Sequence, residues 1–189
     1  MCEAQNAVNP FGLTSILTMP QLKILVSKSD SGLNALAKEK KMAIRTITKY
    51  GKDDILKKVC RSQLTFDDRL AVTLDDMADT MYEAEGVGLA APQVGILRRF
   101  VVIDIGQGLI ELVNPVIVEK RGEQREVEGC LSVEGKSGVT VRPMYVKVRG
   151  QNRKGENIVV EGEGLLARAL CHEIDHLDGI LFLDRLENK

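Results

Sequence analysis

Short connections between the β-type segments in the middle of the chain restrict the folds that it can adopt. Four segments rich in Val and Ile are expected to form strands, at residues 99–105, 110–118, 138–148 and 157–161. The turns at 106–108 and 152–155 leave no room for a crossover helix. Neighbouring strands are therefore predicted to pair mostly in antiparallel fashion.

Helical patterns flank this β-rich region on both sides. Between residues 66 and 82, hydrophobic side chains recur at steps of three and four, and aspartates occupy the opposite face. A second helix is expected from Leu165 to about Leu177, where Asp178 and Gly179 end it. A helix, a set of strands and a helix, in that order, predict the α+β class.

Composition and charge exclude several classes of function. The 189 residues carry a net charge of −1, from 26 basic and 27 acidic side chains. Without a basic excess, no direct contact with nucleic acid is expected. No apolar run approaches the roughly 20 residues of a membrane span, and the N-terminus does not resemble a secretory signal. With four widely spaced cysteines, the expectation is a cytoplasmic protein with free thiols and no membrane contact.

The first part of the chain differs from the rest. Residues 1–41 contain Pro10 and Pro20 and show no long periodic pattern. We expect residues 1–41 to be an N-terminal extension, either a leader or a fused segment. The catalytic domain is expected to span residues 42–189, beginning near Met42.

The chain contains only two histidines, and both belong to one H-E-x-x-H pattern on the second expected helix. Residues four apart lie on one face of a helix, so the imidazoles of His172 and His176 can reach one metal ion. Glu173 lies about 100° round the helix from His172, where it can act on the water of the metal without binding the metal. The pattern predicts a metal-dependent hydrolase, and two surface histidines without a metal are the plain alternative.

A hydrolytic metal site usually takes three protein ligands and keeps a position for water. No third histidine exists, and the chain ends soon after the pattern, so the third ligand is expected upstream and the thiols are the candidates. Cys171 projects from the helix in another direction, while Cys2 and Cys60 lie in stretches with no other signal. Cys130 is preferred, because Gly129 beside it lets the backbone approach a ligand closely.

Three segments together resemble the signature motifs of the peptide deformylases. They are GVGLAAPQ at 86–93, EGCLS at 128–132 and HEIDHLDG at 172–179. One motif alone would be weak, but all three in this order are highly specific, and the resemblance runs from about residue 42 to residue 189. It implies an α+β fold with a mostly antiparallel sheet packed around a central H-E-x-x-H helix, and with a second, N-terminal core helix.

The resemblance also implies an activity and a metal. The activity is hydrolysis of the formyl group from the N-terminal methionine of newly synthesised polypeptides, which releases formate. Cys130, His172 and His176 are implied to bind one divalent metal per chain. Fe2+ is the expected ion, with Ni2+, Co2+ or Zn2+ as alternatives. Glu173 is implied to be the general acid and base.

Further residues take positions around the substrate by the same resemblance. The side-chain amide of Gln93 and the backbone N–H of Leu131 are implied to face the developing oxyanion. The residues implied to line the peptide-binding cleft are Val87, Gly88, Glu128 and Gly129. From the residues themselves, we also expect Glu128 to pair with Arg142 and to brace the Cys130 loop. The expected partners are N-formylmethionyl nascent peptides and, transiently, the ribosome.

Other functions stay open on the motif residues alone. A metallopeptidase that cleaves internal peptide bonds would use the H-E-x-x-H pattern but would leave Cys130 and Gln93 without a task. A non-catalytic metal-binding domain would need neither Glu173 nor an open coordination position. A binding module without a metal would make the two histidines coincidental.

Overall fold

The computed structural model describes residues 43–52 and 54–187 of the chain. The expected N-terminal extension, residues 1–41, lies outside this part together with Cys2. The division into an extension and a catalytic domain therefore stays a prediction.

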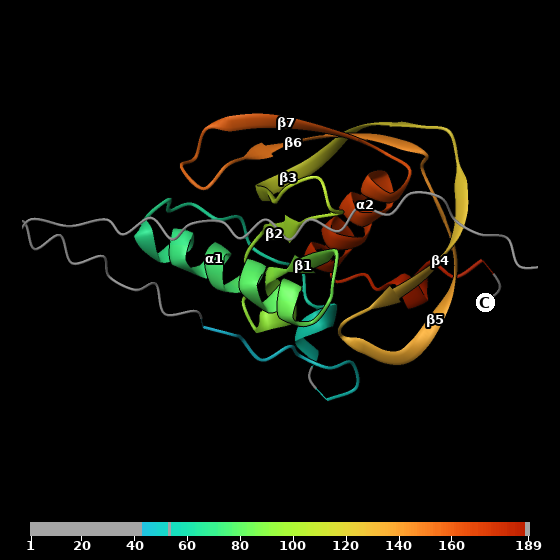
Figure 1. The fold of residues 1–189 in the computed structure, drawn as a ribbon, viewed down its shortest axis with the longest axis horizontal. Helices are drawn as coiled ribbons and strands as arrows, with labels where there is room; N and C mark the ends of the chain where they lie inside the picture. The colour runs from blue at the N-terminus through green and yellow to red at the C-terminus, as the bar shows by residue number, and fades with distance from the viewer. Residues whose placement is uncertain (1–42, 53, 188–189) are drawn as a thin grey trace, which may run out of the picture. The chain divides into compact units, whose positions relative to one another are not determined.

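The described residues form a mixture of helices and antiparallel strands (Figure 1). The helices are α1 (Asp68–Glu83) and α2 (Leu165–Leu177), with short 3-10 helices η1 (Asp54–Lys57), η2 (Ala91–Val94) and η3 (Phe182–Asp184). The strands are β1 (Gly88–Ala90), β2 (Phe100–Ile103), β3 (Ile110–Arg121), β4 (Gln124–Cys130), β5 (Val133–Arg142), β6 (Tyr145–Gln151) and β7 (Asn157–Glu163). The predicted α+β class is confirmed.

The strands build two sheets. One has five strands in the order β1-β2-β3-β6-β7, and the other is the pair β4-β5. Every neighbouring pair of named strands is antiparallel, as the short connections predicted.

The expected strand at 138–148 is wrong as a single element. The structure divides it at Pro143 and Met144, so that β5 pairs with β4 while β6 joins the larger sheet. Proline has no N–H to donate to a strand ladder, and the chain uses this break to pass from one sheet to the other. Strand β4 was not expected, because charged residues interrupt its hydrophobic pattern.

Helix α1 forms where the sequence predicted a core helix. It begins after Asp67, whose side chain accepts a hydrogen bond from the backbone N–H of Leu70 at 3.0 Å. Its buried face packs against one side of the five-stranded sheet, where Met77 and Met81 belong to the same core cluster as Phe100. This helix covers part of the larger sheet and carries none of the expected metal ligands.

Helix α2 contacts strands of both sheets (Figure 1). Its apolar residues Leu170, Ile174 and Leu177 are buried in a core cluster with Val101 and Val148 of the larger sheet. Because the helical repeat is 3.6 residues, the side chains at 165, 168, 169 and 172 fall on another face, which lines a cleft. One face of α2 therefore packs in the core, and another face forms part of the wall of the cleft.

The chain after α2 returns to the smaller sheet. Leu181 and Phe182 are buried with Val133 of β5 and Leu56 of η1, and the side chain of Cys130 packs against this cluster. The backbone N–H of Glu187 donates to the carbonyl of Val139 in β5. The C-terminal segment therefore supports the strand pair that carries Cys130.

Candidate metal centre

The structure brings Cys130, His172 and His176 together. One ligand atom from each lies within 4.8 Å of the other two, and this is the one such cluster of His, Cys, Asp and Glu found among residues 43–52 and 54–187. The imidazoles come from successive turns of α2, and their rings meet edge to face at 4.9 Å between centroids. The thiol comes from the end of β4, far away in sequence.

A β-bulge directs Cys130 toward the helix. The register between β4 and β5 shifts between Glu128 and Cys130, just before the tight turn into β5. Bulges of this kind bend a strand and re-aim a side chain. The Cys130 Sγ consequently lies 3.2 Å from Nε2 of His176.

Each imidazole has one ring nitrogen placed to bind a metal ion. Nδ1 of His172 lies 3.0 Å from a carboxylate oxygen of Glu128, so that its Nε2 is left for a metal. His176 is buried, and its Nδ1 has no hydrogen-bond partner among the described residues while its Nε2 faces the thiol. A carboxylate that holds one histidine ring is a frequent support of metal sites.

The two histidines differ in their affinity for a proton. Burial alone lowers the pKa of His172, but hydrogen bonds with Cys130 and Glu128 outweigh burial and raise it to about 10. Burial and the charge on His172 lower the pKa of His176 well below its usual 6.5. The two imidazoles of the cluster therefore differ strongly in proton affinity, although both lie in largely buried positions.

This donor set fits a divalent transition metal. One sulfur and two imidazole nitrogens are ligands that such ions prefer, and three protein ligands leave a coordination position open for water or substrate. The convergence of the three atoms, and the buried Nε2 of His176 beside the thiol, suit a shared ion better than they suit unrelated side chains.

Glu173 follows His172 on α2 and lies beside this cluster. Its side chain is buried, and Oε2 has no hydrogen-bond partner among the described residues. Burial raises the pKa of Glu173 to about 7, although the charge on His172 opposes the change. A β-carbon added to Gly88 would clash with Oε1 of Glu173, so the carboxylate occupies the space that glycine leaves.

The amide of Gln93 is held in one orientation. Its Oε1 accepts a hydrogen bond from the backbone N–H of Ala90 at 2.8 Å. Its Nε2 therefore points the other way, toward Ser132 Oγ at 3.2 Å and Cys130 Sγ at 3.5 Å. The motif at 86–93 forms strand β1 and most of the 3-10 helix η2, which places this buried side chain beside the thiol.

A cleft of about 630 Å³ opens onto the cluster. All four residues expected to contact the peptide line it, namely Val87, Gly88, Glu128 and Gly129, as do Gln93, Leu131 and Glu173. The walls come from the β1 region, from β4 and from the N-terminal half of α2. A groove of this size accommodates a short peptide rather than a folded protein.

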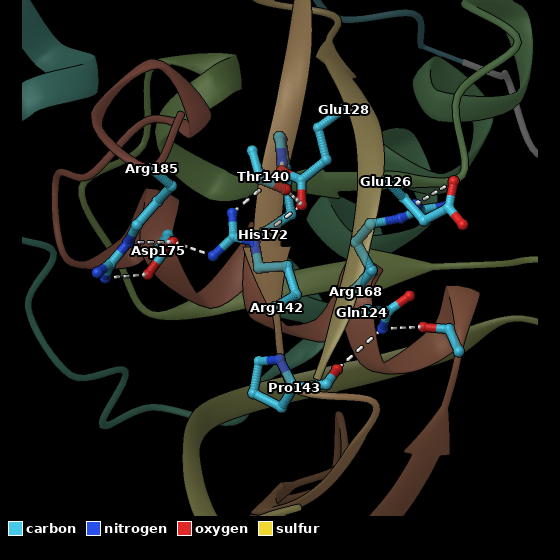
Figure 2. Close-up of polar contacts among 11 residues, drawn as sticks. Gln124, Glu126, Glu128, Thr140, Arg142, Pro143, Arg168, His172, Asp175 and Arg185 are labelled. Carbon is cyan, nitrogen blue, oxygen red and sulfur yellow. Dashed lines mark hydrogen bonds and ion pairs between the residues drawn. The ribbon is translucent and has the colours of Figure 1, made fainter. Parts of the chain in front are cut away.

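The expected pair of Glu128 and Arg142 is confirmed and is part of a larger network (Figure 2). Arg142 Nε and Nη2 donate to the two oxygens of Glu128 at 2.8 and 3.0 Å, and Thr140 donates to Oε1 at 2.7 Å. Burial alone raises the pKa of Glu128, but hydrogen bonds from His172 and Arg142 lower it to about 2. The carboxylate is thus ionised and fully occupied by protein groups.

Three residues in or next to the site were not among the residues expected from the sequence. Lys49 lines the cleft, and its ammonium group donates to the carbonyl of Leu131 at 3.0 Å. Arg168 also lines the cleft, 4.0 Å from the carboxylate of Glu126 (Figure 2). Asp175 lies within the H-E-x-x-H segment, where its helical spacing from His172 was the one available hint of a supporting position.

The two other described cysteines lie apart from the cluster. Cys60 and Cys171 are buried in the core cluster around α2. Burial is the main cause that raises the pKa of each thiol to about 11. They are packing residues, in agreement with their rejection as ligands.

Comparison with known proteins identifies the family. The chain matches the polypeptide deformylase family over residues 44–189. It is 60% identical over 145 residues to a peptide deformylase of Acetivibrio thermocellus, covering 77% of this chain and 85% of that protein. It is 57% identical to peptide deformylase 1 of Clostridium acetobutylicum, covering 77% of this chain and 96% of that protein.

Solved structures give the same result. The peptide deformylase of Thermotoga maritima superposes with a TM-score of 0.75 at 41% identity, over 77% of this chain and 99% of that one. The peptide deformylase of Synechococcus elongatus, solved in complex with actinonin, has a TM-score of 0.74 at 38% identity, over 79% and 86% of the two chains.

The resemblance seen in the three motifs is thereby confirmed. Peptide deformylases are metal-dependent hydrolases that remove the formyl group from the N-terminal methionine of newly synthesised polypeptides. The identities are high, and they extend over nearly the whole length of the relatives, so the function is carried with the fold. This chain belongs to the peptide deformylase family.

Proposed function

We propose that this chain carries out deformylation at the cluster of Cys130, His172 and His176, which holds one divalent metal. The observation that carries the proposal is the convergence of the three ligand atoms within 4.8 Å, with Cys130 and His172 in the wall of the cleft. The α2 helix, with its H-E-x-x-H segment, is then the central element of the fold, since it joins both sheets to the cleft.

The donor atoms support a divalent transition metal, and the resemblance to the family is the reason to propose iron. A divalent metal, when bound, supplies the Lewis acidity that makes water reactive and polarises a carbonyl near neutral pH. We propose Fe2+ as the ion in the cell, with Ni2+, Co2+ and Zn2+ able to replace it. A thiolate ligand suits such softer ions better than it suits Mg2+ or Ca2+.

Glu173 is proposed as the general base and then the general acid. A group with a pKa of about 7 can both accept and return a proton near neutral pH. The carboxylate takes a proton from the attacking water and later delivers it to the amine nitrogen as the C–N bond breaks. The products are formate and a free N-terminal methionine.

Gln93 and the backbone N–H of Leu131 are proposed to stabilise the negative charge that develops on the formyl oxygen. Since Gln93 Oε1 is bound to the backbone of Ala90, the amide can present only its N–H groups to the cluster. A donor fixed before the reaction is worth on the order of 3 kcal/mol to the transition state.

The cleft is proposed to hold the start of a nascent peptide along Val87, Gly88 and Gly129. The carboxylate of Glu128 lies among Arg142, Thr140 and His172, so this residue contributes to the wall while its charge supports the site. The volume of about 630 Å³ suits a short peptide segment, and we propose that the cleft takes the formylated start of a chain in preference to an internal peptide bond.

The domain bounds, the cellular location and the partners are proposed from the resemblance to the peptide deformylases. The catalytic domain spans residues 42–189, the protein acts in the cytoplasm, and its substrates are N-formylmethionyl peptides met during transient contact with the ribosome. No helix in the described part of the chain has the length and apolar character needed to cross a membrane.

The test is release of formate from a formyl-Met tripeptide by protein purified without oxygen, with the metal content measured in parallel. Glu173→Ala should abolish formate release while the metal is retained. Cys130→Ser should lower the metal content itself. A folded, metal-loaded protein that releases no formate would refute the proposal and would favour a peptidase or a structural metal site.

A further inference from the structure

The proposed metal ligands belong to two elements that lie far apart in the sequence, so the chain connection does not fix the distance between them. Cys130 lies at the end of β4, whereas His172 and His176 lie on α2, about forty residues later. A metal ion tolerates only small changes in the separation of its ligands. Some group must therefore hold the end of β4 at a fixed distance from α2.

Arg142 connects these two elements through a single guanidinium group (Figure 2). Nε and Nη2 bind both oxygens of Glu128, which is two residues before Cys130. Nη1 donates to Oδ2 of Asp175 at 2.5 Å, and Asp175 lies on α2 between the two histidines. The side chain of Arg142 is only 5% exposed, so solvent screens these contacts weakly.

Ion pairs extend on both sides of Arg142. Two carboxylates, Glu128 and Asp175, meet two guanidinium groups, Arg142 and Arg185. Arg185 reaches Asp175 from the C-terminal segment at 3.1 and 3.2 Å (Figure 2). Among the described residues, loss of Arg142 would leave the buried carboxylate of Glu128 without a guanidinium partner, and Asp175 with the half-exposed Arg185 as its one remaining ion-pair partner.

We propose that Arg142 is a positioning residue, which sets the separation between the thiol of Cys130 and the two imidazoles by binding Glu128 and Asp175 at once. It touches neither metal nor substrate. Its action passes through Glu128, which also orients the His172 ring, and through Asp175, which ties the helix. The inference rests on the proposed assignment of Cys130, His172 and His176 as metal ligands.

The planar fork of arginine is essential to this role. Three nitrogens of one guanidinium bind two carboxylates in fixed directions, and the single ammonium group of lysine cannot reproduce that geometry. Arg142→Lys keeps the charge and much of the volume, so it isolates the bridging geometry. Asp175→Asn is a second variant, which keeps the shape of the helix residue and removes the charge that Arg142 binds.

The test measures the dissociation constant for Co2+ and the absorption spectrum of the Co2+ form, whose bands depend on coordination geometry. Arg142→Lys and Asp175→Asn are expected to weaken Co2+ binding about 10- to 100-fold and to change the spectrum. Arg125→Lys is the matched control, because Arg125 lies in the same strand pair but is exposed and bound to Glu187. The control should leave both quantities unchanged.

Measurements at a temperature where all metal-free variants are folded separate positioning from stability. An unchanged dissociation constant in folded Arg142→Lys and Asp175→Asn would overturn the inference, even if both unfolded at lower temperature. Cys130→Ser separates failure of the metal site from failure of the positioning role of Arg142. If Cys130→Ser binds Co2+ as the unaltered protein does, the proposed metal site itself fails; if Cys130 is required and Arg142 is not, only the positioning role fails.

Discussion

Glu173 is expected to destabilise the metal-free protein above neutral pH. Its pKa rises from 4.5 in the unfolded chain to about 7 in the folded protein, because burial disfavours the carboxylate. The folded state thus holds its proton more tightly, so stability is greater at low pH and is lost as the pH rises from about 4.5 to 7. Because a tenfold change in proton affinity corresponds to about 1.4 kcal/mol, the full loss above pH 7 is about 3 kcal/mol.

The perturbation that exposes this effect is Glu173→Gln, which keeps the shape and removes the charge. After removal of the metal by a chelator, the variant is expected to exceed the unaltered protein in free energy of unfolding by about 3 kcal/mol at pH 8. At pH 5 the part of this difference in free energy of unfolding that depends on pH should fall below about 1 kcal/mol, since the folded carboxyl is then protonated. Urea unfolding followed by circular dichroism measures both values.

A matched control is Glu83→Gln at the exposed end of α1, where the carboxylate keeps its water in the folded state. Its effect on stability should be the same at both pH values. If Glu173→Gln also changed stability equally at pH 5 and pH 8, burial of the charge would not be the cause, and the argument for a proton acceptor near neutral pH would lose its basis. Activity of Glu173→Gln should be lost throughout.

Other perturbations have separate expected outcomes. Gly88→Ala places a methyl group against the carboxylate of Glu173, so kcat for formate release should fall about 10²- to 10⁴-fold with unchanged metal content. Asp67→Ala removes the side-chain cap of α1 and should cost about 1 kcal/mol in urea unfolding, with activity retained. Phe182→Ala empties a fully buried position and should cost about 3–5 kcal/mol, measured by thermal unfolding. In air, the Fe2+ form should lose activity faster than the Ni2+ form as Cys130 oxidises; equal lifetimes would contradict this.

Local patterns in the sequence were sufficient for much of the fold. The spacing of hydrophobic residues predicted helix α1, and short turns predicted antiparallel strands, because both depend on neighbours along the chain. Strand β4 was missed because Arg125, Glu126 and Glu128 interrupt its hydrophobic pattern and four of its seven residues are exposed. Its partner β5 and the strand β6 were merged, because the hydrophobic pattern continues through Pro143 while the chain changes sheets.

In the candidate site, too, some features were predictable from the sequence and others required the tertiary structure. The sequence by itself determined the candidate residues: two histidines one helical turn apart and a cysteine beside a glycine as proposed ligands, with a glutamate between the histidines, since these follow from local spacing and motif. Only the tertiary structure decided that Cys130 reaches His176, that Gly88 makes room for Glu173, and that Arg142 joins β4 to α2. Those contacts depend on how the bulge in β4 and the packing of α2 orient side chains in space, and distances between segments far apart in the chain are set by the packed core.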